Sequence, residues 1–309
     1  MSGTAKTGFR GSTWFKLVWV VPVAIIALAL VVLAARWMRE LPAVQDFIAR
    51  YPGETHLPDG APVGLPAWIG WQHFFNVFLM VLIIRSGWIV RTKQRPAAHW
   101  TRNNTGLVRT KNPPKRISLD LWLHLSLDAI WFVNGIVFVV LLFASGQWMR
   151  IVPTSWDIFP NALSTLIQYA SLNWPTENGW VNYNSLQVIA YFLTVFIAAP
   201  LAAITGIRMS GAWPAKARKL NKVYPVQLAR AIHFPVMLYF VLFIIVHVTL
   251  VFATGALRNL NHMFASRDDG SWAGFWIFAV SLVVITAAWL AARPLVLRPI
   301  ASLGGKVSR

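Results

Sequence analysis

The chain has 309 residues, of which 57% are hydrophobic and only 12% are charged, and its mean hydropathy is +0.55. This composition excludes an ordinary water-soluble globular protein and predicts an integral membrane protein. Because the sequence has no cysteine, it also excludes disulfides, thiolate-ligated iron–sulfur clusters, zinc–thiolate sites and covalent c-type haem attachment. Any cofactor must therefore be held by histidine or by noncovalent burial.

Apolar runs predict six membrane-crossing helices. A helix needs about 20 largely apolar residues to cross ~30 Å of hydrocarbon. The runs that meet this requirement are roughly 17–35, 68–90, 121–144, 186–207, 232–254 and 273–292. The first run follows basic residues, as a secretory signal does, but its length of about 19 apolar residues favours a retained anchor. The connectors are too small to fold independently, so we expect one all-α helical bundle.

Charge sorts the connectors into two groups. One face holds 21 of the 28 Lys and Arg residues, in segments 1–16, 91–119, 208–231 and 293–309. The other face holds six Lys or Arg residues and eight of the ten acidic residues, in segments 36–67, 145–185 and 255–272. The positive-inside rule makes the first group cytoplasmic and places both termini inside. We interpret the basic stretch from Arg91 to Arg116 as a solvated inner loop attracted to anionic lipid, and not as a nucleic-acid site.

Small residues recur at the ends of the runs. A hydroxyl residue precedes glycine at four such places, Ser86-Gly87, Ser145-Gly146, Thr205-Gly206 and Thr254-Gly255. Glycine caps at helix C-termini explain this pattern, and room for a flat ligand close to the backbone is the alternative. The small residues between Phe196 and Gly206 permit close approach by a neighbouring helix or by a macrocycle. The aromatic connector from about 149 to 182 is expected to lie along the interface as a short amphipathic helix or to dock a partner.

Four of the seven histidines lie inside the apolar runs: His73, His124, His233 and His247. Such residues are rare at membrane depth and usually functional, because an unpartnered polar ring is costly in hydrocarbon. His233 and His247 share one helix and are 14 residues apart, which separates them by ~21 Å and turns them to within ~40° of each other. The ligands of one metal ion cannot lie so far apart, so this helix face predicts two separate cofactors.

Depth in the membrane selects the partners of these two histidines. His73 and His247 lie toward the outer ends of their helices, whereas His124 and His233 lie near inner ends. Each pair is placed to clamp one haem iron by two axial imidazoles. Six-coordinate iron has no open position for oxygen chemistry, so such sites favour electron transfer. The alternative is an ordinary bundle in which each histidine makes an interhelical hydrogen bond.

Three segments carry a resemblance to a known family. They are WQHFFNVFLMVLIIRSG from Trp71 to Gly87, WLHLSLDAIWFVNG from Trp122 to Gly135, and AIHFPVMLYFVLFIIVHVTLVFATG from Ala231 to Gly255. Through them the chain resembles the di-haem cytochrome b subunits of bacterial respiratory complexes, the family of the formate dehydrogenase gamma subunit and of the cytochromes b of nickel–iron hydrogenase and thiosulfate reductase. The resemblance covers about residues 68–255, or four of the six predicted helices.

The resemblance implies a four-helix core over residues 68–255, with His73, His124, His233 and His247 as the axial ligands of two haems b. It also implies electron transfer between a partner oxidoreductase subunit, containing molybdenum or another metal, and the quinone pool of a bacterial inner (plasma) membrane. Residues 1–67 then form an N-terminal anchor and outer connector, and residues 256–309 a final membrane helix and basic inner tail. On this interpretation the chain is an electron-transfer subunit and not a stand-alone enzyme. In that family the first core helix usually starts on the cytoplasmic side, whereas here it starts outside. The resemblance therefore does not decide which haem faces the partner subunit and which faces quinone.

Two other functions are compatible with the sequence, and four other polar residues lie in the predicted membrane helices. The alternative functions are a free-standing haem b quinone oxidoreductase and a cofactor-free transporter or membrane scaffold. Arg85 and Asp128 lie within predicted membrane helices, where an ion pair between them is the favoured interpretation. Alternatively, Arg85 meets a haem propionate and Asp128 relays protons to a quinone. Asn76 and Asn134 either bond a cofactor or join helices.

Overall fold

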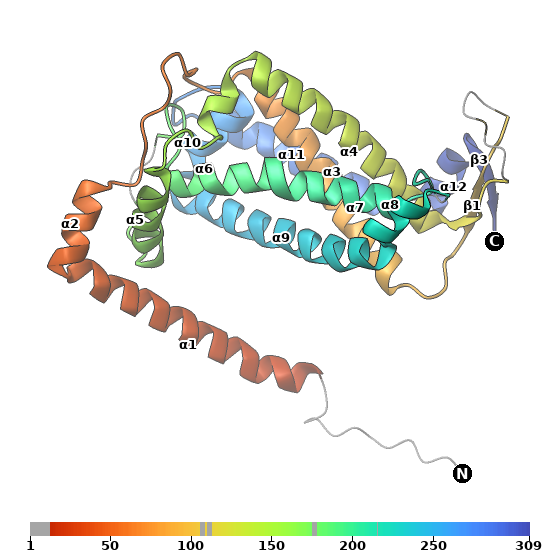
Figure 1. Ribbon diagram of the computed structural model, residues 1–309, viewed down its shortest axis with the longest axis horizontal. Helices are drawn as coiled ribbons and strands as arrows, with labels where there is room; N and C mark the ends of the chain where they lie inside the picture. The colour runs from red at the N-terminus through yellow and green to blue at the C-terminus, as the bar shows by residue number, and fades with distance from the viewer. Residues whose placement is uncertain (1–12, 106–108, 110–112, 175–177, 215) are drawn as a thin grey trace, which may run out of the picture.

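The computed structural model describes residues 13–105, 109, 113–174, 178–214 and 216–309 (Figure 1). Within this part of the chain, six segments are long and apolar enough to cross a membrane. They are α1 (Thr13–Glu40), α3 (Ala67–Thr92), α4 (Leu119–Ala144), the continuous segment Ser185–Met209, α9 (Val226–Ala253) and α11 (Ala273–Ala291). The six predicted spans are confirmed, and the chain is a multi-pass membrane protein. Most of the predicted inner segment 1–16 lies outside the described residues.

The spans expose apolar side chains and bury few residues. In the most apolar window of each span, at most 17% of residues are buried. A helix surrounded by lipid has no need to hide its apolar side chains, so this pattern is the one expected of a bundle in a bilayer. Among the described residues, two small clusters of buried apolar side chains join the spans, one of Leu79, Leu82 and Leu127 between α3 and α4, the other of Ala198, Val236 and Phe240 beside α9.

The fourth span is not a regular α-helix. It consists of α6 (Ser185–Phe192), the π-helical segment η3 (Leu193–Ala198) and α7 (Ala199–Met209). Pro200 has no backbone N–H to continue the ladder, which accounts for the irregular turn before it. Thr194 in this turn shares a hydrogen bond of 2.8 Å with the hydroxyl of Tyr239 in α9. Ala199 and Ala202 pack beside the same helix, so the small residues serve close helix approach here.

Helix α1 runs along the outside of the bundle and joins it at its C-terminal end (Figure 1). There, Arg36 Nε and Arg39 Nη1 each donate a hydrogen bond of 3.2 Å to Ser171, to its carbonyl and its hydroxyl respectively. A short helix, α2 (Pro42–Arg50), follows. Only 6% of the residues in the apolar window of α1 are buried, so most of this helix faces away from the rest of the chain.

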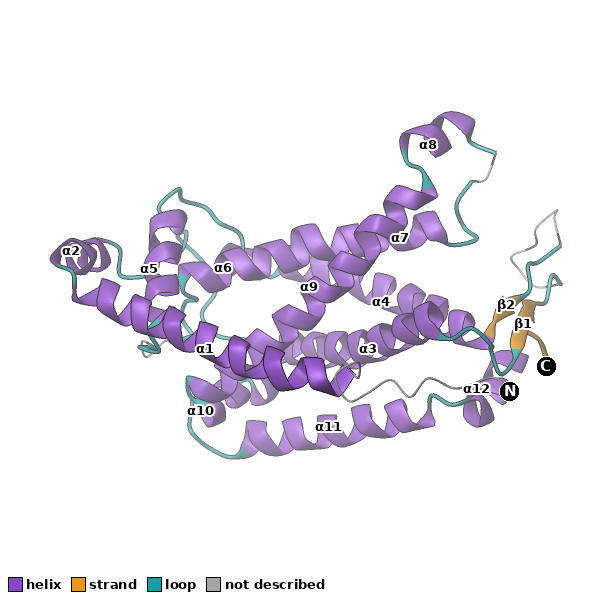
Figure 2. Cartoon of the chain, turned by 90° about the horizontal axis from the view of Figure 1, so that it is seen from below, coloured by secondary structure: helices purple, strands orange, loops and turns teal. Residues whose placement is uncertain are grey.

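The end of the bundle that carries the acidic connectors is called the outer end. Its short elements are η2 (Gln147–Arg150), α5 (Ile158–Ala170), α10 (Ala256–Leu260) and η4 (Asn261–Ala265). Helix α5 lies across the ends of the spans instead of along them (Figure 1, Figure 2). Its buried face is polar, because Asn161 and Thr165 bond the backbone of Gly53, whereas Phe159, Leu163 and Leu166 are exposed. The amphipathic helix is present with its polar face turned into the protein.

The opposite, inner end carries the basic connectors. Its short elements are α8 (Arg218–Val223), α12 (Pro294–Ser302) and an antiparallel sheet in the order β2–β1–β3, with β1 (His99–Arg102), β2 (Ile117–Ser118) and β3 (Gly305–Ser308) (Figure 2). In this sheet Trp100 pairs with Ile117 on one side and with Val307 on the other. The basic connector and the C-terminal segment therefore fold together. The predicted all-α class is confirmed, and this small sheet is an addition to it that the sequence analysis did not predict. Its strands of two to four residues are too short to show an alternating pattern.

Candidate functional site

The four histidines of the spans lie on three helices. His73 is in the second turn of α3, His124 is in the second turn of α4, and α9 supplies both His233 and His247. Since α3 begins at the outer end and α4 at the inner end, His73 and His124 lie at opposite ends of the bundle. Helix α9 spans both ends and offers one histidine to each.

The structure brings these side chains together as two pairs. The ring centroids of His73 and His247, the outer pair, are 6.2 Å apart. Those of His124 and His233, the inner pair, are 6.4 Å apart. Halfway between the two histidines of α9, the ring of Phe240 meets the ring of Trp131 edge to face at 6.5 Å. The pairing is the one that depth in the membrane predicted.

The separation within each pair suits one metal ion between two imidazoles. A metal–imidazole bond is about 2.0 Å, and the centroid of a five-membered ring lies about 1.15 Å behind the ligating atom. Two rings facing one iron from opposite sides therefore have centroids about 6.3 Å apart. Both observed separations are close to this value, which is compatible with one iron between the two rings of each pair. Axial ligation itself stays a prediction.

Hydroxyl groups fix the orientation of the inner pair. Ser86 donates to the carbonyl of Ile83 at 3.0 Å, so its oxygen accepts from Nδ1 of His124 at 3.0 Å. Thr205 donates to the carbonyl of Leu201 and accepts from Nδ1 of His233 at 2.8 Å. With Nδ1 protonated in both rings, Nε2 carries the lone pair that a metal needs.

Sequence reasoning did not assign these roles to Ser86 and Thr205. The sequence feature that could have revealed them is the recurring hydroxyl–glycine pair, which has two different structural roles. At Ser145-Gly146 and Thr254-Gly255 it caps helix C-termini, and both glycines have positive φ. The cap interpretation is wrong for Ser86-Gly87 and Thr205-Gly206, which lie inside α3 and α7. A Cβ on Gly87 would come within 3.0 Å of Cε1 of His124, so the missing side chain makes room for the imidazole.

The outer pair has aromatic neighbours instead of hydroxyl partners. Phe243 stacks on His247 with ring planes 4° apart, and Phe264 of η4 meets His73 edge to face at 5.6 Å. Nδ1 of His73 is buried and has no hydrogen-bond partner among the described residues. A buried polar atom without a partner is costly, which marks this ring as incomplete without a ligand.

The other polar residues of the spans have varied partners. The expected ion pair between Arg85 and Asp128 is wrong: both residues are described, and neither appears in an ion pair with the other. Asp128 lies one turn from His124, with its Oδ2 3.6 Å from Nε2 of that ring, whereas the guanidinium of Arg85 lies over the Trp289 ring of α11 at 5.1 Å. Because the Arg85 side chain turns toward α11, the two charges do not meet.

Two asparagines of the spans also differ. Asn76 joins α3 to α4 by accepting a hydrogen bond of 3.2 Å from Nε1 of Trp131. Nδ2 of Asn134 is buried and unpartnered among the described residues.

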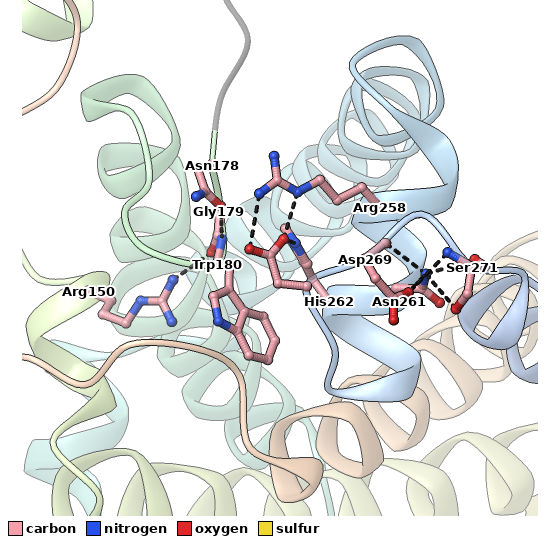
Figure 3. Close-up of polar contacts among 10 residues, drawn as sticks. Arg150, Asn178, Gly179, Trp180, Arg258, Asn261, His262, Asp269 and Ser271 are labelled. Atoms are coloured by element: carbon pink, nitrogen blue, oxygen red, sulfur yellow. Dashed lines mark hydrogen bonds and ion pairs between the residues drawn. The ribbon is translucent and has the colours of Figure 1, made fainter.

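A cluster of polar side chains joins the connectors at the outer end (Figure 3). The fully buried Arg150 donates to the carbonyls of Gly64 and Gly179, at 2.7 and 2.6 Å, and so joins two connectors. The ring of His262 lies against that of Trp180, with the two planes tilted by 44°. Its Nε2 is 2.7 Å from Oδ1 of Asp268, and two nitrogens of Arg258 donate to the same carboxylate. His262 shares η4 with Phe264, so the cluster is joined directly to the element that contacts His73.

Both His262 and Asp268 of this outer cluster are harder to protonate than the free side chains. Burial lowers the pKa of His262 below its ordinary value, and the hydrogen bond to Asp268 offsets this only in part. Hydrogen bonds from Arg258 and His262 lower the pKa of Asp268 to about 2. At neutral pH the cluster therefore holds a carboxylate between a guanidinium and a neutral imidazole.

Comparison with known families decides the identity. A model of a family described as prokaryotic cytochrome b561 matches residues 66–266 of the chain. The chain belongs to the prokaryotic cytochrome b561 family. It is therefore a membrane cytochrome that binds haem b and takes part in electron transfer, and a cofactor-free transporter or scaffold is excluded. The matched part of this cytochrome b561 protein contains all four span histidines. Comparison with curated proteins and with solved structures finds no match.

Proposed function

We propose that the chain is an electron-transfer subunit that binds two haems b, one between His73 and His247 and one between His124 and His233. In this proposal it passes electrons between a separate, metal-containing oxidoreductase subunit and the membrane quinone pool. The haem-binding core is residues 68–255, residues 1–67 are an anchor and outer connector, and residues 256–309 are a final helix and inner tail. Both termini lie in the cytoplasm.

The observation that carries the proposal is the matched separation of the two ring pairs. Centroid distances of 6.2 and 6.4 Å fit one iron in each pair, at opposite ends of α9. A haem b bound there supplies a one-electron iron couple. The chain contributes Nε2 atoms as ligands at the inner pair, and it keeps them oriented through Ser86 and Thr205. Phe240 and Trp131 meet edge to face midway along α9 between the two pairs.

The direct test is haem quantification of the purified protein, together with a reduced-minus-oxidised optical spectrum. We expect two haems b per chain. His247→Ala should remove the outer haem and His124→Ala the inner one, each leaving the other in place. His56→Ala changes an exposed histidine of the outer connector and should retain both. One haem in the unaltered protein, or loss of both haems in each single variant, would contradict the two-site assignment.

The partner needs a separate measurement. Purification from native membranes should yield a second polypeptide that contains molybdenum or another redox metal, and the isolated pair should reduce or oxidise a quinone analogue. If the chain instead purifies alone and exchanges electrons with quinone and a small soluble carrier, it is a free-standing haem b quinone oxidoreductase. That outcome would remove the subunit assignment and leave the two haem sites intact.

A further inference from the structure

The inner end of the molecule has a hollow that the haem sites do not use. It lies between α12 and β3 and has a volume of about 300 Å³. Its lining residues are Arg298, Pro299, Ser302, Val307, Ser308 and Arg309. Two of these six side chains are guanidinium groups, and none of the described residues that line the hollow is Asp or Glu. The hollow therefore favours an anion.

Arg298 is the lining residue with unused hydrogen-bonding capacity. Its Nη2 donates to the carbonyl of Ala97 at 3.1 Å, which orients the guanidinium. Its Nε is buried and has no hydrogen-bond partner among the described residues. Asp120, in the first turn of α4 at the same end of the bundle, is paired with Lys93 at 3.0 Å. Nη1 of the same guanidinium also has no hydrogen-bond partner among the described residues and is not buried, so it is the nitrogen that an anion in the hollow can reach.

The surroundings of the hollow are electropositive. Arg116 donates to the carbonyl of Arg309 at 2.8 Å, which holds another guanidinium beside the end of β3. The connectors of this face carry most of the Lys and Arg residues of the chain. Such a surface attracts anionic headgroups, at about 1 kcal/mol for each basic residue near the membrane.

Apolar surface borders the hollow on its other side. Helix α12 begins three residues after α11 ends, so it lies at the membrane boundary. Leu297 and Ala301 bury one face of α12 against the inner sheet and α4. Leu295 and Leu303 are each 86% exposed. At about 100° per residue, these leucines lie on the face of α12 next to Pro299 and Ser302, which line the hollow.

We propose that this hollow binds the phosphate of an anionic phospholipid, with Arg298 as its principal ligand and Leu295 and Leu303 against the acyl chains. Free phosphate shares the headgroup chemistry but has no use for the leucines. A short interfacial helix with a basic side and an exposed apolar side is the arrangement that binds anionic lipid at a membrane surface. The bound lipid would hold the inner sheet against the bilayer.

The test uses the full-length protein in nanodiscs of phosphatidylcholine with a minor fraction of phosphatidylglycerol, and measures by native mass spectrometry the lipid retained on release. We expect phosphatidylglycerol to be retained over phosphatidylcholine. Arg298→Gln should lower this retention about fivefold, which corresponds to ~1 kcal/mol. Arg218→Gln removes one charge from α8, on the same face but on the other side of the bundle, and should leave retention unchanged (Figure 2). Size-exclusion profiles establish that both variants are folded.

Two further arms separate the sources of phosphate. Leu303→Gln should weaken retention of phosphatidylglycerol, because the acyl chains contact this leucine. The same variant should not change the concentration of inorganic phosphate that competes for the hollow, because free phosphate does not contact the leucine. Retention that inorganic phosphate abolishes, and that Leu303→Gln leaves unchanged, would overturn the lipid assignment. Equal losses in Arg298→Gln and Arg218→Gln would overturn the site itself, since the attraction would then belong to the whole basic face.

Discussion

At the scale of single residues, hydroxyl side chains decide which nitrogen of the inner histidines is free. The hydroxyls of Ser86 and Thr205 each donate their single hydrogen to a backbone carbonyl of their own helix. Their oxygens can then only accept from the histidine Nδ1 atoms. This is the role that outer partners of metal-bound histidines commonly have, and losing such a partner costs about 10–100-fold in metal affinity.

We expect Ser86→Ala to weaken haem binding at the inner site by about tenfold, because His124 loses the acceptor that fixes its ring. The measurement is haem transfer to an excess of a haem-scavenging protein, followed optically, with the outer haem as an internal reference. Ser145→Ala is the matched control, since Ser145 bonds only the carbonyl of Leu141 in its own helix and lies at the outer end of α4. Equal haem loss in both variants would show that the Ser86 hydroxyl does not support the site.

The outer cluster has a pH dependence whose sign follows from its pKa values. In the folded protein, His262 has a pKa below its ordinary value of 6.5, and Asp268 has one of about 2 instead of 3.8. Both groups are thus harder to protonate when folded than when unfolded. The stabilisation from His262 is present above pH 6.5 and is lost as the pH falls below it. That from Asp268 is lost between 3.8 and about 2.

Amide hydrogen exchange of peptides from 255–272, corrected for intrinsic rates, should therefore rise several-fold as the pH falls below 6.5, while exchange in α11 stays constant. His262→Gln should remove this first step and leave the step from Asp268. If exchange over 255–272 does not change across this range, burial of His262 does not oppose its protonation.

At the scale of helices, the apolar runs predicted the spans because bilayer thickness sets a minimum helix length. The ends of the helices were less predictable. Helix α9 starts at Val226, six residues before the predicted run, because Pro225 is at its N-cap and polar residues extend the helix into the inner end. The π-helical turn before Pro200 and the fold of the 91–119 connector depend on contacts between distant segments. A pattern of hydropathy along the chain does not contain such contacts.

The approach of α3 to α4 depends on Gly87. Alanine is favoured over glycine inside a helix by about 1 kcal/mol, so propensity alone predicts that Gly87→Ala stabilises α3. However, the added Cβ would be 3.0 Å from Cε1 of His124, and the ring would have to move. We expect Gly87→Ala to lower occupancy of the inner haem and shift its reduced absorption band. Gly135→Ala in α4, where a Cβ would meet nothing within 4 Å, should change neither. Identical spectra for all three proteins would mean that the ring does not need this space.

At the scale of the whole molecule, the candidate site was more predictable than many details of the fold. The spacing of His233 and His247 and the depths of His73 and His124 depend only on helix geometry and on the alternation of spans across the bilayer. The partners of these rings were not predictable, because Ser86 and Thr205 come from helices whose rotation the sequence does not specify. The outer cluster was missed for a similar reason, since Arg150, Trp180 and His262 come from three parts of two connectors.

The orientation of the whole bundle is the remaining expectation, and the absence of cysteine makes it directly measurable. Because 21 of the 28 Lys and Arg residues belong to one end, that end should face the cytoplasm. A single cysteine at exposed Asp59, in Asp59→Cys, should react with a membrane-impermeant maleimide on intact cells. Lys219→Cys, in exposed α8, should react only in inverted vesicles, and the unaltered chain serves as the unlabelled control. The reverse pattern would place the His73–His247 pair on the cytoplasmic side, and would exchange the haems assigned to the two faces of the membrane.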